Sequence, residues 1–391
     1  MLHNIFRCLC ICLFCSSGLF AQLSDSPIRI FGYFQNQFEA QRTIDAKPAQ
    51  KNTSFSLQQL NLFFQKDLHD AWTAFINIEM LNSFSDSRRT GAINLEEAWV
   101  KFRSSKHFNL KLGLQIPIFN NLNEIKNRTP LLPYVIRPLV YETSFNEFID
   151  IDAFVPGQAY IQAYGFKPMK TAKLDYAVYL GNSDNLNDNS IKSSGRSGTD
   201  STEAFLIGGR LGLRKGELKI GSSFTYDRVN SFMGLENIFG GNPDRFELLP
   251  RVRFGGDLSF NWKSFSFEGE YIHLIHDDDI DEFSLDKDFF YATAGCWFMD
   301  ERLYTFVSYW QTNEDAPIEF LTQNRNQIVP GQFTPGELEI NVPNIGFSYN
   351  LTDLIRIKSH YAYVTINTFE DGGLLEKEKF HDVSAAISII F

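Results

Sequence analysis

Segments that alternate apolar and polar residues run from near the start of this sequence to its last residue, and they constrain the fold more than any other feature. Successive side chains of a β-strand point to opposite faces, so the alternation predicts strands with one apolar and one polar face. Sixteen such strands are predicted, at roughly 28–41, 53–65, 71–82, 93–103, 108–116, 157–167, 172–181, 203–213, 216–228, 251–262, 264–276, 288–299, 301–314, 339–350, 353–365 and 378–391.

The connections between these strands alternate in length. After even-numbered strands they are short, as at 66–70 and 168–171, and after odd-numbered strands they are longer and polar, as at 182–202 and 315–338. Short turns at one rim and long loops at the other are typical of a transmembrane up-and-down antiparallel β-barrel. We therefore predict an all-β barrel of about 16 strands. An even strand number returns both termini to the rim with the short turns, which faces the periplasm.

Both ends of the sequence favour export to an outer membrane. Residues 1–21 contain Arg7, a short apolar run and a small residue, Ala21, which is the pattern of a cleaved signal peptide. Residues 22–391 then form a single barrel domain. The last strand alternates and finishes on Phe391. This ending resembles the C-terminal sorting strand of Gram-negative outer-membrane proteins, which typically finish on Phe.

Composition narrows the class further. The chain has 38 Phe, 15 Tyr and 5 Trp, which suits the aromatic girdles of a membrane barrel. After residue 21 the only cysteine is Cys296, so neither an internal disulfide nor a cysteine-based metal site can form. The formal net charge of −11 argues against a nucleic-acid partner. No apolar run after residue 22 approaches the ~18 residues of a transmembrane helix.

The strand faces place charged residues inside the barrel. A register shift of one residue would turn these charges into lipid, so the register is well specified. Two interpretations stay open: the charges pair across neighbouring strands and stabilise the wall, or they select ions. The wall charges that we expect to line the pore are Lys101, Lys111, Arg251, Arg253, Glu268, Glu270, Arg356 and Lys358.

The longest connection, residues 117–156, is the best candidate for a functional element. A sixteen-stranded barrel is too wide for side chains to fill, so something must narrow it. This connection is rich in apolar residues and proline, and Leu131, Leu132, Val135, Ile136 and Leu139 can pack against the inner wall. We predict that this third long loop folds into the barrel; the alternative is an extracellular cap. The charges expected at the constriction are Glu124, Lys126, Arg128, Arg137, Glu142 and Glu147.

The whole mature chain resembles the porins of Gram-negative outer membranes. The residues that carry this resemblance are Ile28–Phe38, Trp99–Arg103 and Leu110–Pro117. They are similar to the Bacteroidota porins that include the phosphate-selective porin O/P group. The resemblance implies passive diffusion of small hydrophilic solutes or ions, contact with outer-membrane lipid and lipopolysaccharide, and assembly as a homotrimer or with another outer-membrane protein.

Other functions have weaker support in the sequence. About six residues separate Ala21 from the first strand, which leaves no room for the plug of an active transporter. None of the histidines after residue 21 has a recognisable nucleophile beside it, so we expect no enzyme activity and no cofactor. The carboxylates Asp277, Asp279 and Asp281 are better explained as a solvated loop than as a Ca²⁺ site. A non-channel barrel, such as an adhesin or a structural component, remains the alternative.

Ion preference is the last expectation. The wall charges are mostly basic, whereas those of the 117–156 loop are mostly acidic. Charges act over roughly 8 Å at physiological salt, so the loop should dominate at the narrowest point. The sequence therefore predicts little selectivity or a mild preference for cations.

Overall fold

The computed structural model describes residues 27–44, 51–83, 92–126, 128–142, 154–183, 204–229, 249–277, 284–317, 335–370 and 373–391. The predicted signal peptide, residues 1–21, lies outside the described residues. Among the residues described, no helix has the length and apolar character needed to cross a membrane.

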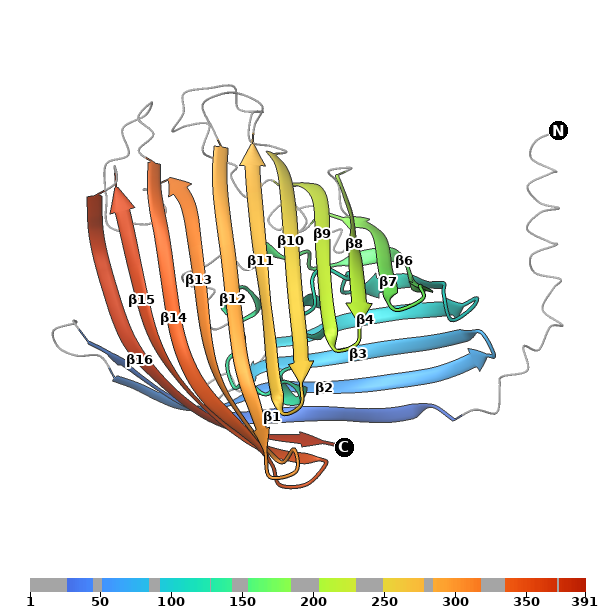
Figure 1. Ribbon diagram of the computed structural model, residues 1–391, viewed down its shortest axis with the longest axis horizontal. Coiled ribbons are helices and arrows are strands. Elements are labelled where there is room, and N and C mark those ends of the chain that lie inside the picture. The colour runs from blue at the N-terminus through green and yellow to red at the C-terminus, as the bar shows by residue number, and fades with distance from the viewer. Residues whose placement is uncertain are drawn as a thin grey trace.

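Sixteen antiparallel strands close into one barrel, in which each strand pairs with its neighbours in sequence and the first pairs with the last (Figure 1). All sixteen predicted strands are confirmed, with ends that differ by a few residues. Their bounds are β1 Arg29–Thr43, β2 Lys51–His69, β3 Trp72–Ser83, β4 Ala92–Arg103, β5 Asn109–Gln115, β6 Ala159–Pro168, β7 Lys173–Asn182, β8 Phe205–Lys215, β9 Leu218–Val229, β10 Leu249–Trp262, β11 Phe265–Asp277, β12 Ser284–Phe298, β13 Leu303–Pro317, β14 Pro335–Asn350, β15 Ile355–Glu370 and β16 Gly373–Ile390.

The two chain ends complete the closure. β1 and β16 pair from Tyr33 opposite Ile390 to Thr43 opposite Phe380. Beyond that pairing, the backbone N–H groups of Gly32 and Phe391 each donate a hydrogen bond of 2.9 Å to the carbonyl oxygen of the other residue. A Cβ atom on Gly32 would lie 2.9 Å from the Phe391 ring and 2.3 Å from the Asn61 carbonyl oxygen. The seam therefore requires glycine at this position.

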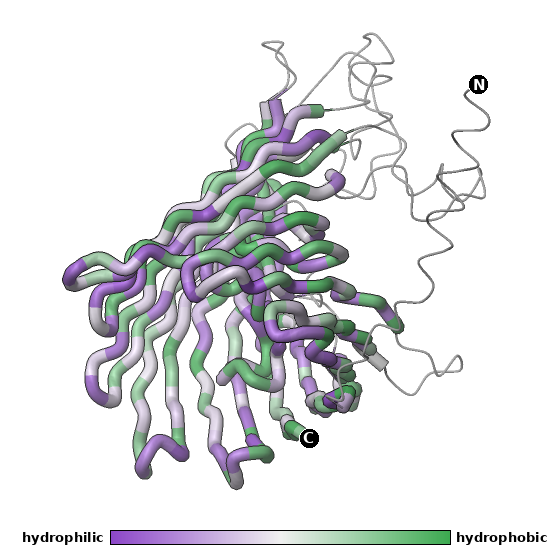
Figure 2. The backbone as a smooth tube through the Cα atoms, turned by 90° about the vertical axis from the view of Figure 1, so that its right-hand side faces the viewer, coloured by the Kyte–Doolittle hydropathy of each residue, from purple (hydrophilic) through white to green (hydrophobic). Residues whose placement is uncertain are grey.

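The predicted faces are confirmed along the wall. On β10, Phe254, Leu258 and Phe260 are exposed on the outside, whereas Arg251 and Arg253 are buried inside. Figure 2 shows the same alternation of hydropathy along the strands. Lipid contact explains the apolar exterior, and the charges inside require an interior that is at least partly polar.

Candidate functional site

The described part of the segment between β5 and β6 leaves the wall and packs against its inner face (Figure 1). β5 is only seven residues long, and its pairing with β6 shifts between Leu112 and Gln115. Gly113, inside this shift, has φ +116°, a conformation that glycine adopts without strain. Pro117 then follows, which cannot donate to a ladder, so the strand ends here. Three short 3₁₀ turns shape the described part of the loop: η1 Asn123–Ile125, η2 Thr129–Leu131 and η3 Leu139–Tyr141.

Two carboxylates of β11 hold this loop in place. Glu270 accepts hydrogen bonds from the backbone N–H groups of Asn121 at 3.0 Å and Leu122 at 2.8 Å, and from the Tyr141 hydroxyl at 2.6 Å. Glu268 accepts a hydrogen bond from the Tyr134 hydroxyl. Burial raises the pKa of Tyr134 and of Tyr141 well above the ordinary tyrosine value, so both hydroxyls remain protonated donors. Both carboxylates therefore act as anchors of the loop.

Two cations of β15, four strands along the wall from β11, also hold the loop. The Lys358 ammonium donates to the carbonyl oxygens of Thr129 at 2.7 Å and Tyr134 at 3.1 Å, and also to the Gln35 side chain at 2.8 Å. The Arg356 guanidinium donates to the Leu131 carbonyl oxygen at 2.8 Å. Both wall cations were expected to line the pore, and in the structure they donate to backbone carbonyl oxygens of the loop.

Apolar packing joins the loop to the wall between β11 and β16. Of the five apolar loop residues predicted to pack there, Leu132, Val135, Ile136 and Leu139 are buried, while Leu131 is 40% exposed. They belong to clusters that extend to the inner faces of the strands at Phe289, Trp310, Ile340, Val342 and Val364, among others. The described part of the loop therefore packs through apolar side chains against the inner faces of these strands.

The loop charges have two different environments. Arg137 and Glu142 form an ion pair of 3.3 Å, with both side chains almost fully buried, and Arg137 also donates to the Lys126 carbonyl oxygen at 2.6 Å. Both residues were expected at the constriction, and in the structure they pair with each other within the folded loop. Glu124, Lys126 and Arg128 are half-buried. Glu147 lies outside the described residues.

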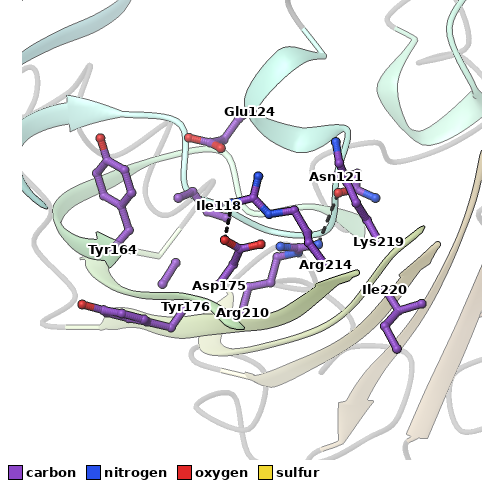
Figure 3. Close-up of a pocket in the computed structure, with 11 residues that line it drawn as sticks. Ile118, Asn121, Glu124, Tyr164, Asp175, Tyr176, Arg210, Arg214, Lys219 and Ile220 are labelled. Carbon is purple, nitrogen blue, oxygen red and sulfur yellow. Dashed lines mark hydrogen bonds and ion pairs between the residues drawn. The ribbon is translucent and has the colours of Figure 1, made fainter. Parts of the chain in front are cut away.

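A cavity of about 240 Å³ remains between the loop and the wall formed by β6 to β9 (Figure 3). Arg210 bridges to Asp257 at 2.9 and 2.6 Å and donates to the Asn121 side chain of the loop at 3.2 Å. Arg214 forms an ion pair with Asp175. The lining residues are Ile118, Asn121, Glu124, Tyr164, Asp175, Tyr176, Ala177, Arg210, Arg214, Lys219 and Ile220.

Basic side chains stand opposite one another on the wall beside this cavity. On β4 and β5, Lys101 pairs in register with Lys111. Across β7, β8 and β9, Lys173 pairs with Arg214, and Arg214 pairs with Lys219. Like charges directly opposite one another destabilise a sheet, and in these rows Arg214 is compensated by Asp175 and Lys111 by Glu124. Lys219 and Lys173 have no ion-pair partner in the part of the chain that the structure describes.

Lys111 links the first of these pairs to the loop. Its ammonium lies 3.9 Å from a Glu124 carboxylate oxygen, 4.9 Å from the Trp99 ring centroid and 5.6 Å from the Tyr164 ring centroid. Sequence reasoning missed Tyr164, and it placed Arg214 in a turn. Arg214 is four positions after the inward-facing Arg210, so extending β8 to Arg214 would have placed its side chain on the same inner face.

Arg251 and Arg253 support the interpretation that wall charges pair across neighbouring strands. Arg251 donates to Asp227 on β9 at 2.8 Å, and Arg253 lies 3.4 Å from the same carboxylate. All three side chains are almost fully buried. Here the charges pair across neighbouring strands and stabilise the wall. No group of three or more His, Cys, Asp or Glu side chains that could hold a metal ion occurs within the described ranges. Asp279 and Asp281 lie outside those ranges.

The structural comparisons find barrels of the same kind. The anion-selective porin from Comamonas acidovorans has 12% identity and a TM-score of 0.59, covering 94% of this chain and 100% of that one. The outer membrane channel DcaP of Acinetobacter baumannii has 11% identity and a TM-score of 0.56, covering 94% of this chain and 97% of that one. OprB of Pseudomonas putida has 11% identity and a TM-score of 0.56, covering 96% of this chain and 97% of that one. No protein-family model and no curated protein matches the sequence. The narrower resemblance to phosphate-selective porins is not confirmed. The chain therefore shares the sixteen-stranded fold of outer-membrane porins.

Proposed function

We propose that this protein is an outer-membrane porin through which small hydrophilic solutes or ions diffuse passively, and that loop 117–156 narrows its lumen. One observation carries the proposal. The loop is fixed to the β11 and β15 walls by Glu270, Glu268 and Lys358, while a cavity with charged walls stays open beside β6 to β9. A cap at the mouth would not need charged anchors on the inner wall.

The placement of the charges favours anions over cations, in contrast to the mild cation preference expected from sequence. Arg137 and Glu142 neutralise each other inside the loop and cannot set the field in the lumen. The rows Lys101–Lys111 and Lys173–Arg214–Lys219 then dominate beside the cavity, offset in part by Asp175 and Glu124. A structurally similar barrel is described as an anion-selective porin, which agrees with this reading.

Planar-bilayer recording of the purified protein tests the proposal. We expect stepwise conductance and, in a KCl gradient, a reversal potential of the sign for chloride selectivity. Absence of conductance in any salt would favour the alternative, a non-channel barrel that acts as an adhesin or structural component. Conductance with cation selectivity would support the porin function but refute the proposal that the basic rows make the channel anion-selective.

The cellular setting belongs to the same proposal. Residues 1–21 act as the signal peptide, both termini face the periplasm, and the barrel assembles as a homotrimer or with a partner outer-membrane protein. Trimeric assembly is named for one structurally similar protein, OmpT of Vibrio cholerae. Sequencing the N-terminus of the purified protein and measuring its mass in detergent by light scattering test these points.

A further inference from the structure

The cavity between the loop and β6 to β9 has both an apolar and a basic part (Figure 3). Tyr164 stands on one side of it, and Ile118 and Ala177 add apolar lining. Lys219 and Arg214 lie on the other side, with Arg210 beneath them. A solute that touches both parts needs an apolar ring or chain at one end and an anionic group at the other.

The two arginines are largely committed to the protein. Arg210 binds Asp257 with two hydrogen bonds and also contacts Asn121, while Arg214 pairs with Asp175. Lys219 is exposed and directly opposite Arg214, and no carboxylate among the described residues pairs with it. Lys219 is therefore the cation with free capacity for a solute anion.

The Tyr164 ring is held in place by neighbouring side chains and can contact an aromatic ring in the cavity. The Lys111 ammonium lies 5.6 Å from the Tyr164 ring centroid and 4.9 Å from the Trp99 ring centroid. These contacts fix the lysine and both rings. Tyr164 remains half-buried and lines the cavity. Aromatic rings prefer offset-stacked or edge-to-face contacts with other rings, and Tyr164 can supply one to a ring in the cavity.

We propose that this cavity is a binding subsite for aromatic carboxylates, with the carboxylate at Lys219 and the ring against Tyr164. The inference rests on the proposed channel function and names the solute class that it favours. An inorganic anion would use only the basic part of the cavity, and a neutral ring would use only the apolar part.

Two readouts test the subsite on the full-length protein. One is block of single-channel KCl current by benzoate, with acetate and inorganic phosphate as comparison anions. The other is line broadening in the fluorine NMR spectrum of 4-fluorobenzoate added to the protein in detergent, which needs no conductance. We expect benzoate to block the current at lower concentration than acetate or phosphate. In the NMR assay we expect unlabelled benzoate to displace 4-fluorobenzoate at lower concentration than either of these anions.

The variants separate the two ends of the solute. Lys219→Gln should weaken benzoate and acetate alike, by about tenfold, since it removes a charge-assisted hydrogen bond. Tyr164→Leu should weaken benzoate by about fivefold and leave acetate unchanged, and Tyr164→Phe should restore benzoate binding. Lys263→Gln, in the short turn between β10 and β11, is the matched control, and heat-modifiable electrophoretic migration verifies that each barrel is folded.

The outcomes distinguish the subsite from the channel. If acetate or phosphate equals benzoate in the wild-type protein, or if Tyr164→Leu weakens all anions equally, the aromatic subsite is refuted while the porin stands. If 4-fluorobenzoate binds as expected but no current is observed, the subsite stands and the proposed channel function fails.

Discussion

Replacing Glu270 with leucine should release the loop from the wall and widen the pore. In the native protein this carboxylate accepts hydrogen bonds from Asn121 N–H, Leu122 N–H and Tyr141 O–H. Leucine accepts none of them, so three donors of the loop, two of them buried, would lose their partner in the docked state. Undocking lets water satisfy them, which shifts the equilibrium away from the docked loop.

The magnitude follows from these three contacts. A buried donor left without an acceptor costs about 1–3 kcal/mol. Partial relaxation makes about 3 kcal/mol a conservative sum for the three donors. Since 1.4 kcal/mol is tenfold in an equilibrium constant, the ratio of undocked to docked loop should rise by roughly 100-fold. The barrel itself should stay folded, because no strand pairing depends on this side chain.

Single-channel recording measures the effect. We expect Glu270→Leu to show higher mean conductance and frequent current fluctuations, with unchanged heat-modifiable migration of the folded barrel. Glu270→Gln is the matched control, because its amide oxygen still accepts from the two backbone N–H groups, and it should behave like the native protein. Native conductance and native noise in Glu270→Leu would show that the loop does not depend on this anchor or does not narrow the pore.

Four further predictions address the loop and the charges. Deleting residues 121–147 should raise single-channel conductance while heat-resistant barrel migration is retained; unchanged conductance would mean that the loop does not restrict the pore. The double variant Lys173→Gln/Lys219→Gln should shift the KCl reversal potential toward cation selectivity, because it removes two cations that have no ion pair among the described residues. The control variant Lys263→Gln should leave the reversal potential unchanged. Burial raises the pKa of Glu124, which interacts with Lys111, Arg128, Glu97 and Arg210. As the pH is lowered, Glu124 should become protonated at a pH above the usual carboxyl range, and the channel's preference for anions should then increase. A Glu124→Gln variant that shows the same pH dependence would contradict the assignment of this effect to Glu124. Arg137→Ala leaves Glu142 buried without its cation, which costs about 3–5 kcal/mol for a buried pair, so we expect increased current noise and no simple change of ion preference.

The sequence by itself determined the barrel. Alternation with period two defines each strand and its lipid face locally, and connection lengths define the order of pairing, so sixteen strands and the outward position of residues such as Phe254 could be predicted. The apolar residues of the 117–156 loop also indicated burial inside the lumen, because an apolar loop in water is costly. Each of these conclusions depends only on the chemistry of residues near one another in the chain.

Only the tertiary structure decided which charges remain accessible in the lumen and which bind the loop or pair with other charges. Lys358 and Glu270 have the alternation phase of pore-lining residues, yet both bind the loop, which reaches them from more than 100 positions away in sequence. Arg137 and Glu142 cancel each other because the loop turns back on itself between them. Lys219 stays available because strand register places it opposite Arg214 and not opposite a carboxylate. Strand alternation fixes the face of a side chain, whereas its partners depend on which distant segments the closed barrel brings to that face.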